Sequence, residues 1–336
     1  MRFIISLIVT LAFFSCKTNE NIPDVSDIKI KITTKRFEKD LFTADTNQLV
    51  AKMDTLAYLY PSFGSTFFQV ILNADPRWGS DTTKQYINGF LSSQKPVFDS
   101  AEKIFNDFTL YENQIIKSLQ YLRYYFPKYA APHEIITYIG PLDGYGDILT
   151  KDAFVIGLQH HLGKSSSIYN SAWLHETYPQ YLTDRFEPDY IVVNCMKNVI
   201  DDMYPDKNEE APFSNQLIEA GKRLYLLQQL IPSFDEYKLI GYSQKQLKDC
   251  YTHEAQIWEL FIQNNLLHSI DKNLIRNYLG EGPKTQELGE GSPGNIGAFV
   301  GWQIVKKYLQ KKPKTTPVEL MKTDPSKILE ESKYKP

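Results

Sequence analysis

The first sixteen residues constrain this chain most, because they decide in which compartment the rest of it folds. A single arginine, Arg2, precedes a largely apolar run over residues 3–14, which Ser15 and Cys16 close. This order is typical of an export signal, with a positive start, a hydrophobic stretch and a small residue at the cleavage point. The run is shorter than the roughly 20 residues that a transmembrane helix needs. We therefore predict that residues 1–15 are removed and that the remainder folds outside the cytoplasm.

The junction at Cys16 resembles the lipobox of bacterial lipoproteins, although Phe13 stands where leucine is usual. The resemblance implies that the Cys16 thiol receives a diacylglyceryl group and that the peptide is cut before it. The new amino terminus is then acylated, for example with palmitate. The alternative is an ordinary signal peptide followed by an incidental cysteine. Lipid attachment at Cys16 would hold the protein on a membrane surface without spanning the bilayer.

Charge limits the partners of the chain. The sequence has 37 Lys and Arg against 40 Asp and Glu, a net charge of −3. Such a balance supplies no strong field for nucleic acid or an anionic bilayer, so we expect no nucleic-acid partner and a membrane link through lipid alone. One acyl chain binds marginally, whereas several anchor stably.

The pattern of apolar residues predicts three parts. Residues 1–15 form the lipoprotein signal peptide, residues 16–27 a polar tether, and residues 28–336 a single α-rich globular domain, with a subdivision near residue 145 as the alternative. Strands are expected where apolar residues alternate or where β-branched residues gather, at 28–32, 133–139 and 153–158. Helical periodicity recurs at 43–60, 83–94, 97–108, 111–126, 188–204, 213–230, 244–265 and 295–310. The expected class is α+β, predominantly α-helical, with a small central sheet.

Motifs for nucleotide and metal chemistry are incomplete. Five residues separate Gly157 from Gly163, where a phosphate-binding loop has four. A zinc-protease helix needs two histidines four residues apart beside a glutamate, and none of the three His-Glu pairs in the chain has the second histidine. We therefore expect no cofactor and no metal site.

Two remaining cysteines and two glycines are expected to serve packing. Cys195 and Cys250 lie among apolar neighbours in predicted helices, so free buried thiols are favoured over a disulfide. Gly297 and Gly301 lie one turn apart in the predicted helix at 295–310. In lipid such a pair would mark a dimer face, but here it favours close packing of a soluble helix.

Three segments carry a resemblance to a known family. Residues 292–305 (SPGNIGAFVGWQIV), 217–223 (LIEAGKR) and 331–336 (ESKYKP) are similar to the GldB family of gliding-motility lipoproteins of the Bacteroidetes. The resemblance implies a lipid-anchored envelope protein, facing the periplasm from either membrane, that gliding requires. It further implies association with other proteins of the gliding and type IX secretion machinery, and no enzymatic activity.

A second resemblance concerns residues 190–225, whose layout is similar to predicted zinc proteases of the gluzincin kind. The resemblance places Asn194 and Asn198 at the two histidine positions, Cys195 at the glutamate base and Glu219 at the third ligand. It implies a zincin-like scaffold with a degenerate metal site, because neutral amides are poor zinc ligands.

The rival hypothesis is a divergent envelope metalloprotease or hydrolase. It would use His160, His161 or Cys250, the last of which lies one helical turn before His253.

Overall fold

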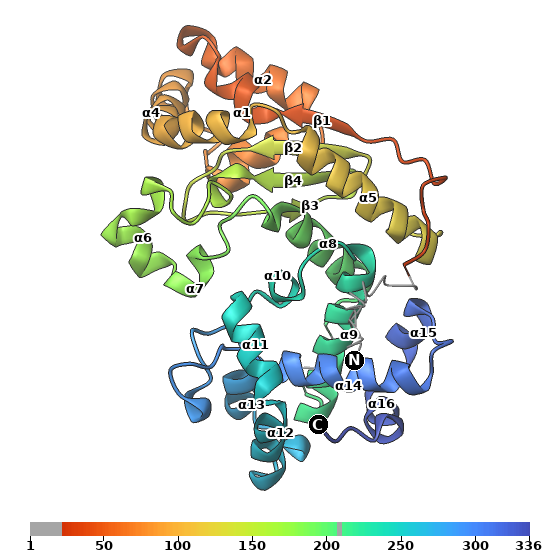
Figure 1. Cartoon of the computed structure of the whole chain (residues 1–336). Helices are drawn as coiled ribbons and strands as arrows, with labels where there is room; N and C mark the ends of the chain where they lie inside the picture. Colours follow the sequence, from red (N-terminus) through yellow and green to blue (C-terminus); the bar gives the residue numbers. More distant parts are fainter. Residues whose placement is uncertain (1–21, 207–209) are drawn as a thin grey trace, which may run out of the picture.

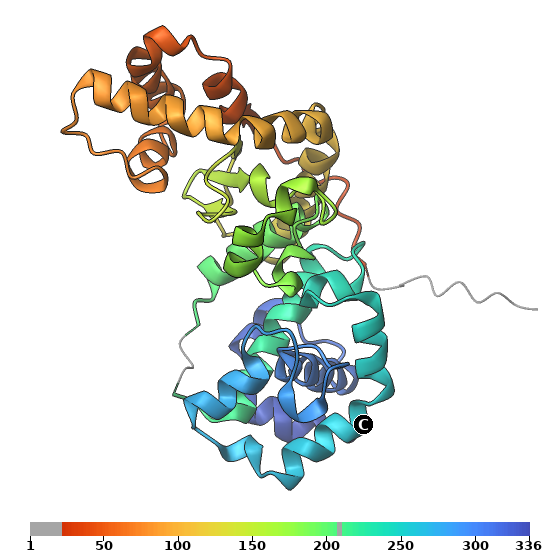
Figure 2. The same ribbon diagram turned by 90° about the vertical axis from the view of Figure 1, so that its left-hand side faces the viewer.

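A small sheet lies between two helical layers in the computed structural model, which describes residues 22–206 and 210–336 (Figure 1). Cys16 and the predicted signal peptide lie outside these residues. Helices from the first third of the chain cover one face of the sheet, and the second half of the chain builds a helical body on the other side. Figure 2 shows the same three levels after a quarter turn, with the C-terminal helices farthest from the N-terminal ones.

The sheet has four strands in the order β1-β2-β4-β3. Their bounds are β1 Thr33–Arg36, β2 Glu134–Tyr138, β3 Ile148–Leu149 and β4 Ala153–Gly157. Strands β1, β2 and β4 run parallel, with Thr33 opposite Glu134 and Glu134 opposite Ala153. The short edge strand β3 runs antiparallel to β4, with Ile148 opposite Val155.

Helices make up most of the described chain. The N-terminal layer contains α1 Phe37–Phe42, α2 Leu49–Leu59, α3 Gly64–Thr66, a π-helical turn at Phe67–Ile71, and α4 Ser80–Phe105; α5 Thr109–Tyr125 crosses the opposite face. After the sheet follow α6 Ala172–Thr177, α7 Gln180–Thr183, α8 Tyr190–Met203, α9 Phe213–Leu230, α10 Glu236–Ile240, α11 Gln244–Thr252, α12 Glu254–Gln263, α13 Lys272–Leu279, α14 Ile296–Lys311, α15 Pro317–Lys322 and α16 Pro325–Ser332.

The side chains on the two faces of the sheet are buried in two separate hydrophobic cores, because successive side chains of a strand point in opposite directions. On β2, Ile136 joins the N-terminal core around Phe37 and Phe67, while Ile135 joins the larger core. On β4, Val155 and Phe154 divide in the same way. A strand that is buried on both faces has a continuous run of apolar residues in its sequence. Residues 153–157 are such a run, and all five are buried.

The helices α9 and α14 cross at Gly221 and Gly301, which lie in the segments 217–223 and 292–305 that carry the family resemblance. A Cβ atom built on Gly301 would lie 1.7 Å from the carbonyl oxygen of Leu217, and one on Gly221 would lie 2.2 Å from the carbonyl carbon of Gly301. The two backbones are therefore in direct contact. Gly297 packs closely against α13: a Cβ atom there would lie 2.9 Å from the side chain of Leu279 and 3.1 Å from the carbonyl oxygen of Tyr278. The prediction that Gly297 and Gly301 serve close helix packing is confirmed.

The predicted α+β class with a small sheet is confirmed, with three local corrections. Residues 28–32 are not a strand, although Ile28, Ile30 and Ile32 are half-buried as their alternation suggests. The neighbouring strand β2 begins at Glu134, which pairs with Thr33, so residues before Thr33 have no strand to pair with. The helices expected at 83–94 and 97–108 are one helix, α4, with Pro96 inside it.

The third correction concerns the helix expected at 244–265. It divides at His253 into α11 and α12, because the backbone of this residue leaves helical geometry at φ −109° and ψ 17°. No helix in the described ranges is both long and apolar enough to cross a bilayer.

Candidate functional site

Polar side chains gather at the edge of the sheet where β2 and β4 end. His160 and His161 follow Gly157, the last residue of β4, and Asp147 directly precedes the antiparallel strand β3. The carboxyl ends of parallel strands are the usual place for ligands in open sheets. The histidines and the aspartate therefore share the edge at which a functional site would be expected.

The loop that carries Asp147 is fastened to the sheet. The hydroxyl group of Tyr138 donates to the carbonyl oxygens of Tyr145, at 2.6 Å, and of Gly146, at 2.8 Å. The side-chain amide of Gln159 also donates to the carbonyl of Tyr145, at 2.8 Å. Gly146 itself has little room, because a Cβ atom there would lie 3.0 Å from Nδ1 of His160. These contacts set the position of the Asp147 side chain.

Asp147 and His161 form a buried ion pair. Nε2 of His161 lies 2.9 Å from Oδ2 of Asp147, and the side chains are 1% and 5% exposed. The carboxylate also accepts hydrogen bonds from the side-chain amide of Asn194, at 2.8 Å, and from the backbone N–H of Gly157, at 3.1 Å. The other ring nitrogen of His161, Nδ1, donates to the carbonyl oxygen of Glu187 at 3.1 Å.

Burial and pairing oppose each other in this pair, and pairing prevails. Burial alone would raise the pKa of Asp147, but the charge of His161 and three donated hydrogen bonds hold that pKa below its ordinary value. Burial alone would lower the pKa of His161, but Asp147 and the carbonyl of Glu187 hold it above its ordinary value. A neutral imidazole has one donor, and here both ring nitrogens donate, so His161 is an imidazolium facing a carboxylate.

This geometry restricts what the pair does chemically. A histidine that acts as a general base needs one ring nitrogen free to face the substrate. Both nitrogens of His161 are already bound to protein oxygens. The pair joins the loop before β3, the segment after β4 and helix α8, and we assign it a structural role.

His160 differs from its neighbour. Its Nε2 donates to the carbonyl oxygen of Leu142 at 2.8 Å, and its ring stacks on Phe186 with centroids 4.7 Å apart. Burial lowers the pKa of His160, so the ring is neutral at pH 7. It lines a cavity of about 190 Å³ together with Arg185, Tyr190, Asn194 and Lys197.

Lys197 is the second unusual group of this cavity. It is half-buried on α8, and burial together with the charge of Arg185 lowers the pKa of its ammonium to about 8. No hydrogen bond or ion pair joins this ammonium to another side chain of the described ranges, although Glu281 and Asp201 act on it at longer range. A lysine in such surroundings is a candidate for function.

The structure brings two of the four predicted metal-site positions together. Asn194 and Asn198 lie one turn apart on α8, and both donate to Asp147, Asn198 to its carbonyl oxygen at 3.2 Å. No hydrogen bond joins Glu219 to either asparagine in the described residues. Glu219 pairs with Lys222 at 2.7 Å, and that ammonium also donates to the carbonyl oxygen of Thr323, just after α15.

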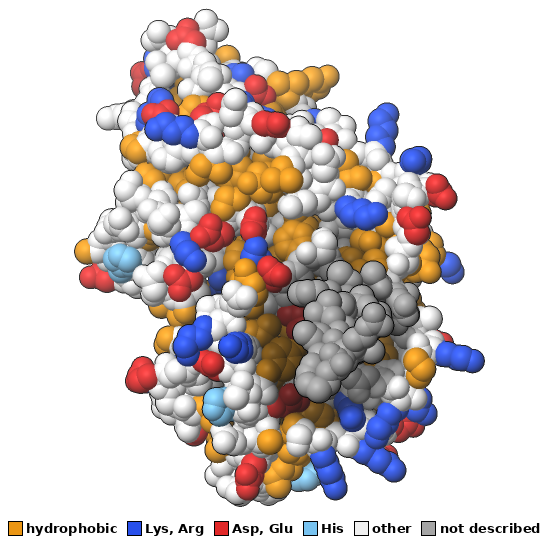
Figure 3. Space-filling model, viewed as in Figure 1, with side chains coloured by type: hydrophobic (Ala, Val, Ile, Leu, Met, Phe, Trp, Pro, Cys, Tyr) orange, Lys and Arg blue, Asp and Glu red, His pale blue; other side chains and the backbone are white. Residues whose placement is uncertain are grey.

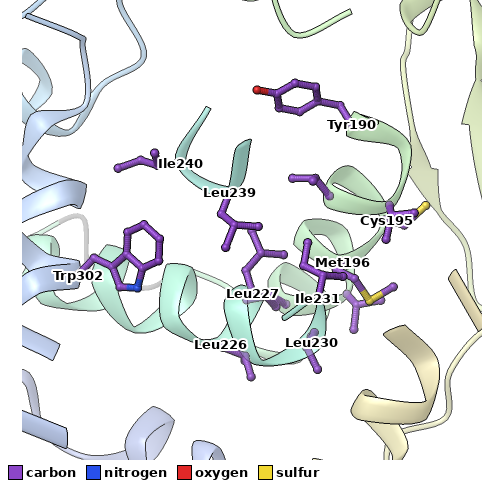
Figure 4. Packing of buried hydrophobic residues seen from close by; sticks show 14 of the residues in the cluster. Tyr190, Cys195, Met196, Leu226, Leu227, Leu230, Ile231, Leu239, Ile240 and Trp302 are labelled. Carbon is purple, nitrogen blue, oxygen red and sulfur yellow. The ribbon is translucent and has the colours of Figure 1, made fainter. Parts of the chain in front are cut away.

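Cys195 faces the core, where Figure 4 shows it next to Met196 on α8. Burial raises the pKa of its thiol well above the ordinary value. Cys250 is also free and buried, and burial raises its pKa to about 12. The prediction of two free buried thiols is confirmed. Neither thiol is activated as a nucleophile, because catalytic cysteines have lowered pKa values.

Sequence reasoning missed Asp147 and Lys197. Asp147 ends the stretch DGYGD at residues 143–147, whose glycines and aspartates are typical of a turn rather than of a functional motif. Lys197 lies between the two asparagines of the zinc-protease layout and carries no motif of its own. The sequence offered no signal for Asp147, because the edge strand β3 that follows it was not predicted and only the pairing of β3 with β4 brings Asp147 to this edge.

Metal content tests the predicted loss of a zinc site. Protein purified without chelator should contain well under one zinc per chain, because Asn194 and Asn198 offer neutral amides that already donate to Asp147. In residues 22–206 and 210–336 no group of three or more His, Cys, Asp and Glu side chains is arranged to hold a metal ion. Elemental analysis measures the zinc directly. Stoichiometric zinc that disappears in an Asn194→Ala variant would contradict the prediction and revive the metalloprotease hypothesis.

Comparison with known proteins gives one match. A family model described as gliding motility protein GldB matches residues 18–336. No curated protein and no solved structure matches the chain. The matched range includes the Asp147–His161 pair, the cavity at Lys197 and the glycine crossing of α9 and α14.

Proposed function

This chain belongs to the GldB family of gliding motility proteins, and from that premise we propose that it is a lipid-anchored envelope protein that acts in gliding through interactions rather than catalysis. The observation that carries the proposal is the extent of the match, which begins two residues after Cys16 and runs to the last residue. A gliding motility role and a place in the cell envelope follow from the family. The lipid anchor, the association with type IX secretion and the absence of catalysis are the proposed parts.

The geometry of the candidate site supports a non-catalytic role. The histidine that has a carboxylate partner, His161, has no ring nitrogen left for a substrate. The two cysteines have raised pKa values. The zincin-like scaffold with its degenerate metal site stays a prediction, and its test is the zinc measurement above.

Membrane attachment depends on one residue in this proposal. We expect Cys16→Ala to abolish fatty-acid incorporation and to release the protein from membranes, because the net charge of −3 supplies no electrostatic substitute for the lipid. Metabolic labelling with a fatty acid and fractionation after a high-salt wash measure the two effects. Ser15→Ala is the matched control, since it keeps a small residue at the cleavage point and should leave both readings unchanged. Labelled fatty acid in the Cys16→Ala protein would refute the anchor.

The function itself is tested in a cell that lacks this protein. Wild-type chain should restore movement over a surface, whereas Cys16→Ala should restore it poorly although the folded protein is present. Crosslinking in the restored cells, followed by identification of the captured proteins, tests the association with gliding and secretion components. Restoration of movement by a Cys16→Ala protein that is fully released from membranes would contradict the proposed anchored mode of action.

A further inference from the structure

A groove runs between the sheet layer and the C-terminal helical body. The cavity of about 190 Å³ at His160 shares Arg185 and Tyr190 with a larger one of about 510 Å³, which extends toward α10 and α11. On its other side it shares Lys197 with a further cavity of about 190 Å³ between α8, α9 and α14. Figure 3 shows acidic and basic side chains gathered in this central band.

The basic residues of the groove are paired, with one exception. Four of them form ion pairs: Lys164 with Glu187, Arg185 with Glu281, Arg223 with Asp201, and Lys238 with Asp189. Lys197 is the fifth, and it has no carboxylate within ion-pair distance among the described residues. The acids that act on it at longer range, Glu281 and Asp201, are those already paired with Arg185 and Arg223.

A half-buried charge without a partner is costly, since its lost hydration is not replaced. The ammonium of Lys197 keeps only part of its hydration, so a negative charge from outside the chain would stabilise it. The other charges on this wall are already compensated, because Arg185 pairs with Glu281 and Asp147 pairs with His161, so Lys197 carries the unpaired charge. The space next to Lys197 is open, so an anion has room to reach it.

Part of the cavity wall is apolar and suits the organic part of a small acid, while Asp147 and Asn194 on the same wall are hydrogen-bonded to each other. Leu182 and Phe186 supply apolar surface beside the stacked ring of His160. The hydroxyl group of Tyr190 has no hydrogen-bond partner among the described residues, and Figure 4 shows it pointing away from the hydrophobic cluster. It lines the same cavity and is available as a donor.

We propose that this cavity binds a carboxylate, with the ammonium of Lys197 as its counter-charge and the hydroxyl of Tyr190 as a hydrogen-bond donor. A carboxylate brings one negative charge for the one unpaired cation, whereas a doubly charged phosphate would meet the acidic residues that already surround the groove. The carboxylate belongs either to a small organic acid or to the end of a peptide chain. This site is independent of the lipid anchor and of the gliding role.

The reactivity of Lys197 tests the proposal in the full chain, purified in detergent. An amine-selective reagent is applied near pH 8, and the modification of each lysine is followed by mass spectrometry of peptides. Butyrate should slow the modification of Lys197 several-fold in a saturable manner, whereas uncharged butyramide should not. Lys164 is the internal control, since it is 59% exposed at the rim and should react equally in both. Equal protection by butyrate and butyramide would overturn the proposal.

A variant and two further ligands complete the test. Butyrate should raise the thermal midpoint of the wild type and of Lys164→Met, and the shift should be lost in Lys197→Met. An unchanged shift in Lys197→Met would refute the role of this residue. A short peptide with a free C-terminal carboxylate, compared with its amidated form, identifies a peptide end as the source if only the free form protects Lys197. Protection by phosphate but by neither carboxylate would reject the carboxylate assignment.

Discussion

Gly301→Ala is expected to destabilise the protein by about 3 kcal/mol or more, although alanine is the better helix former. The added methyl group would lie 1.7 Å from the carbonyl oxygen of Leu217, an impossible distance that only a separation of α9 and α14 can relieve. Backbone atoms of two packed helices cannot move away from the new methyl group as the end of a flexible side chain can. A loss of this size is a large part of the 5–15 kcal/mol that keeps a typical domain folded. Chemical denaturation followed by circular dichroism measures it.

Gly89→Ala is the matched control for this substitution. Gly89 also lies inside a helix, α4, but it is exposed and has no atom within 4 Å of the position of a new Cβ. Alanine there should stabilise the protein by up to about 1 kcal/mol, through helix propensity alone. The two substitutions therefore have opposite expected signs. If Gly301→Ala stabilises the protein as Gly89→Ala does, the direct contact between α9 and α14 is wrong.

Asp147→Asn is expected to destabilise the protein by about 3–5 kcal/mol, because it leaves the imidazolium of His161 buried without its counter-charge. The substitution keeps the shape of the side chain, so the effect reports the charge rather than a cavity. Asp143→Asn is the control in the same loop: Asp143 is exposed, and its substitution should change the stability by no more than about 0.5 kcal/mol. Urea unfolding at pH 6 compares the two. Equal, small effects would show that the pair contributes nothing.

The pH dependence of the wild type gives a second reading of the same pair. The lowered pKa of Asp147 contributes stability that is present above the ordinary aspartate value near 4 and is lost as the pH falls through the lowered value. The raised pKa of His161 contributes stability that is present below the ordinary histidine value near 6.5 and is lost as the pH rises through the raised value. The contribution is therefore greatest between about pH 4 and 6.5. Asp147→Asn should flatten this dependence.

Local sequence patterns predict much of the fold. Helix α9 begins and ends at Phe213 and Leu230, where its apolar periodicity predicted, and α5, α8 and α14 lie within a few residues of their predicted ranges. These segments are amphipathic or largely apolar, and their own pattern selects the helix. The prediction was weaker for strands, because the limits of a strand depend on the neighbouring strand with which it pairs, and that strand can be far away in the sequence. Residues 28–32 alternate correctly but have no neighbour to pair with.

The candidate site was predicted only in part, because its residues come from segments that are far apart in the sequence. Asn194 and Asn198 are found on one face of a helix because their spacing of four residues places them there. Their common partner, Asp147, comes from a loop that only the pairing of β3 with β4 brings to the same edge. Glu219 was expected beside the asparagines, but its carboxylate pairs with Lys222 instead.

The sequence by itself determined the elements that depend on neighbours along the chain: the helices, the continuous apolar strands, and the two glycines that predicted a close helix contact. The tertiary structure alone decided which backbone meets those glycines, which carboxylate faces His161, and which lysine of the groove is left without a partner. Hydrophobic periodicity is a local property of the chain, whereas a charge is paired or unpaired according to the side chains that folding brings within a few ångströms of it.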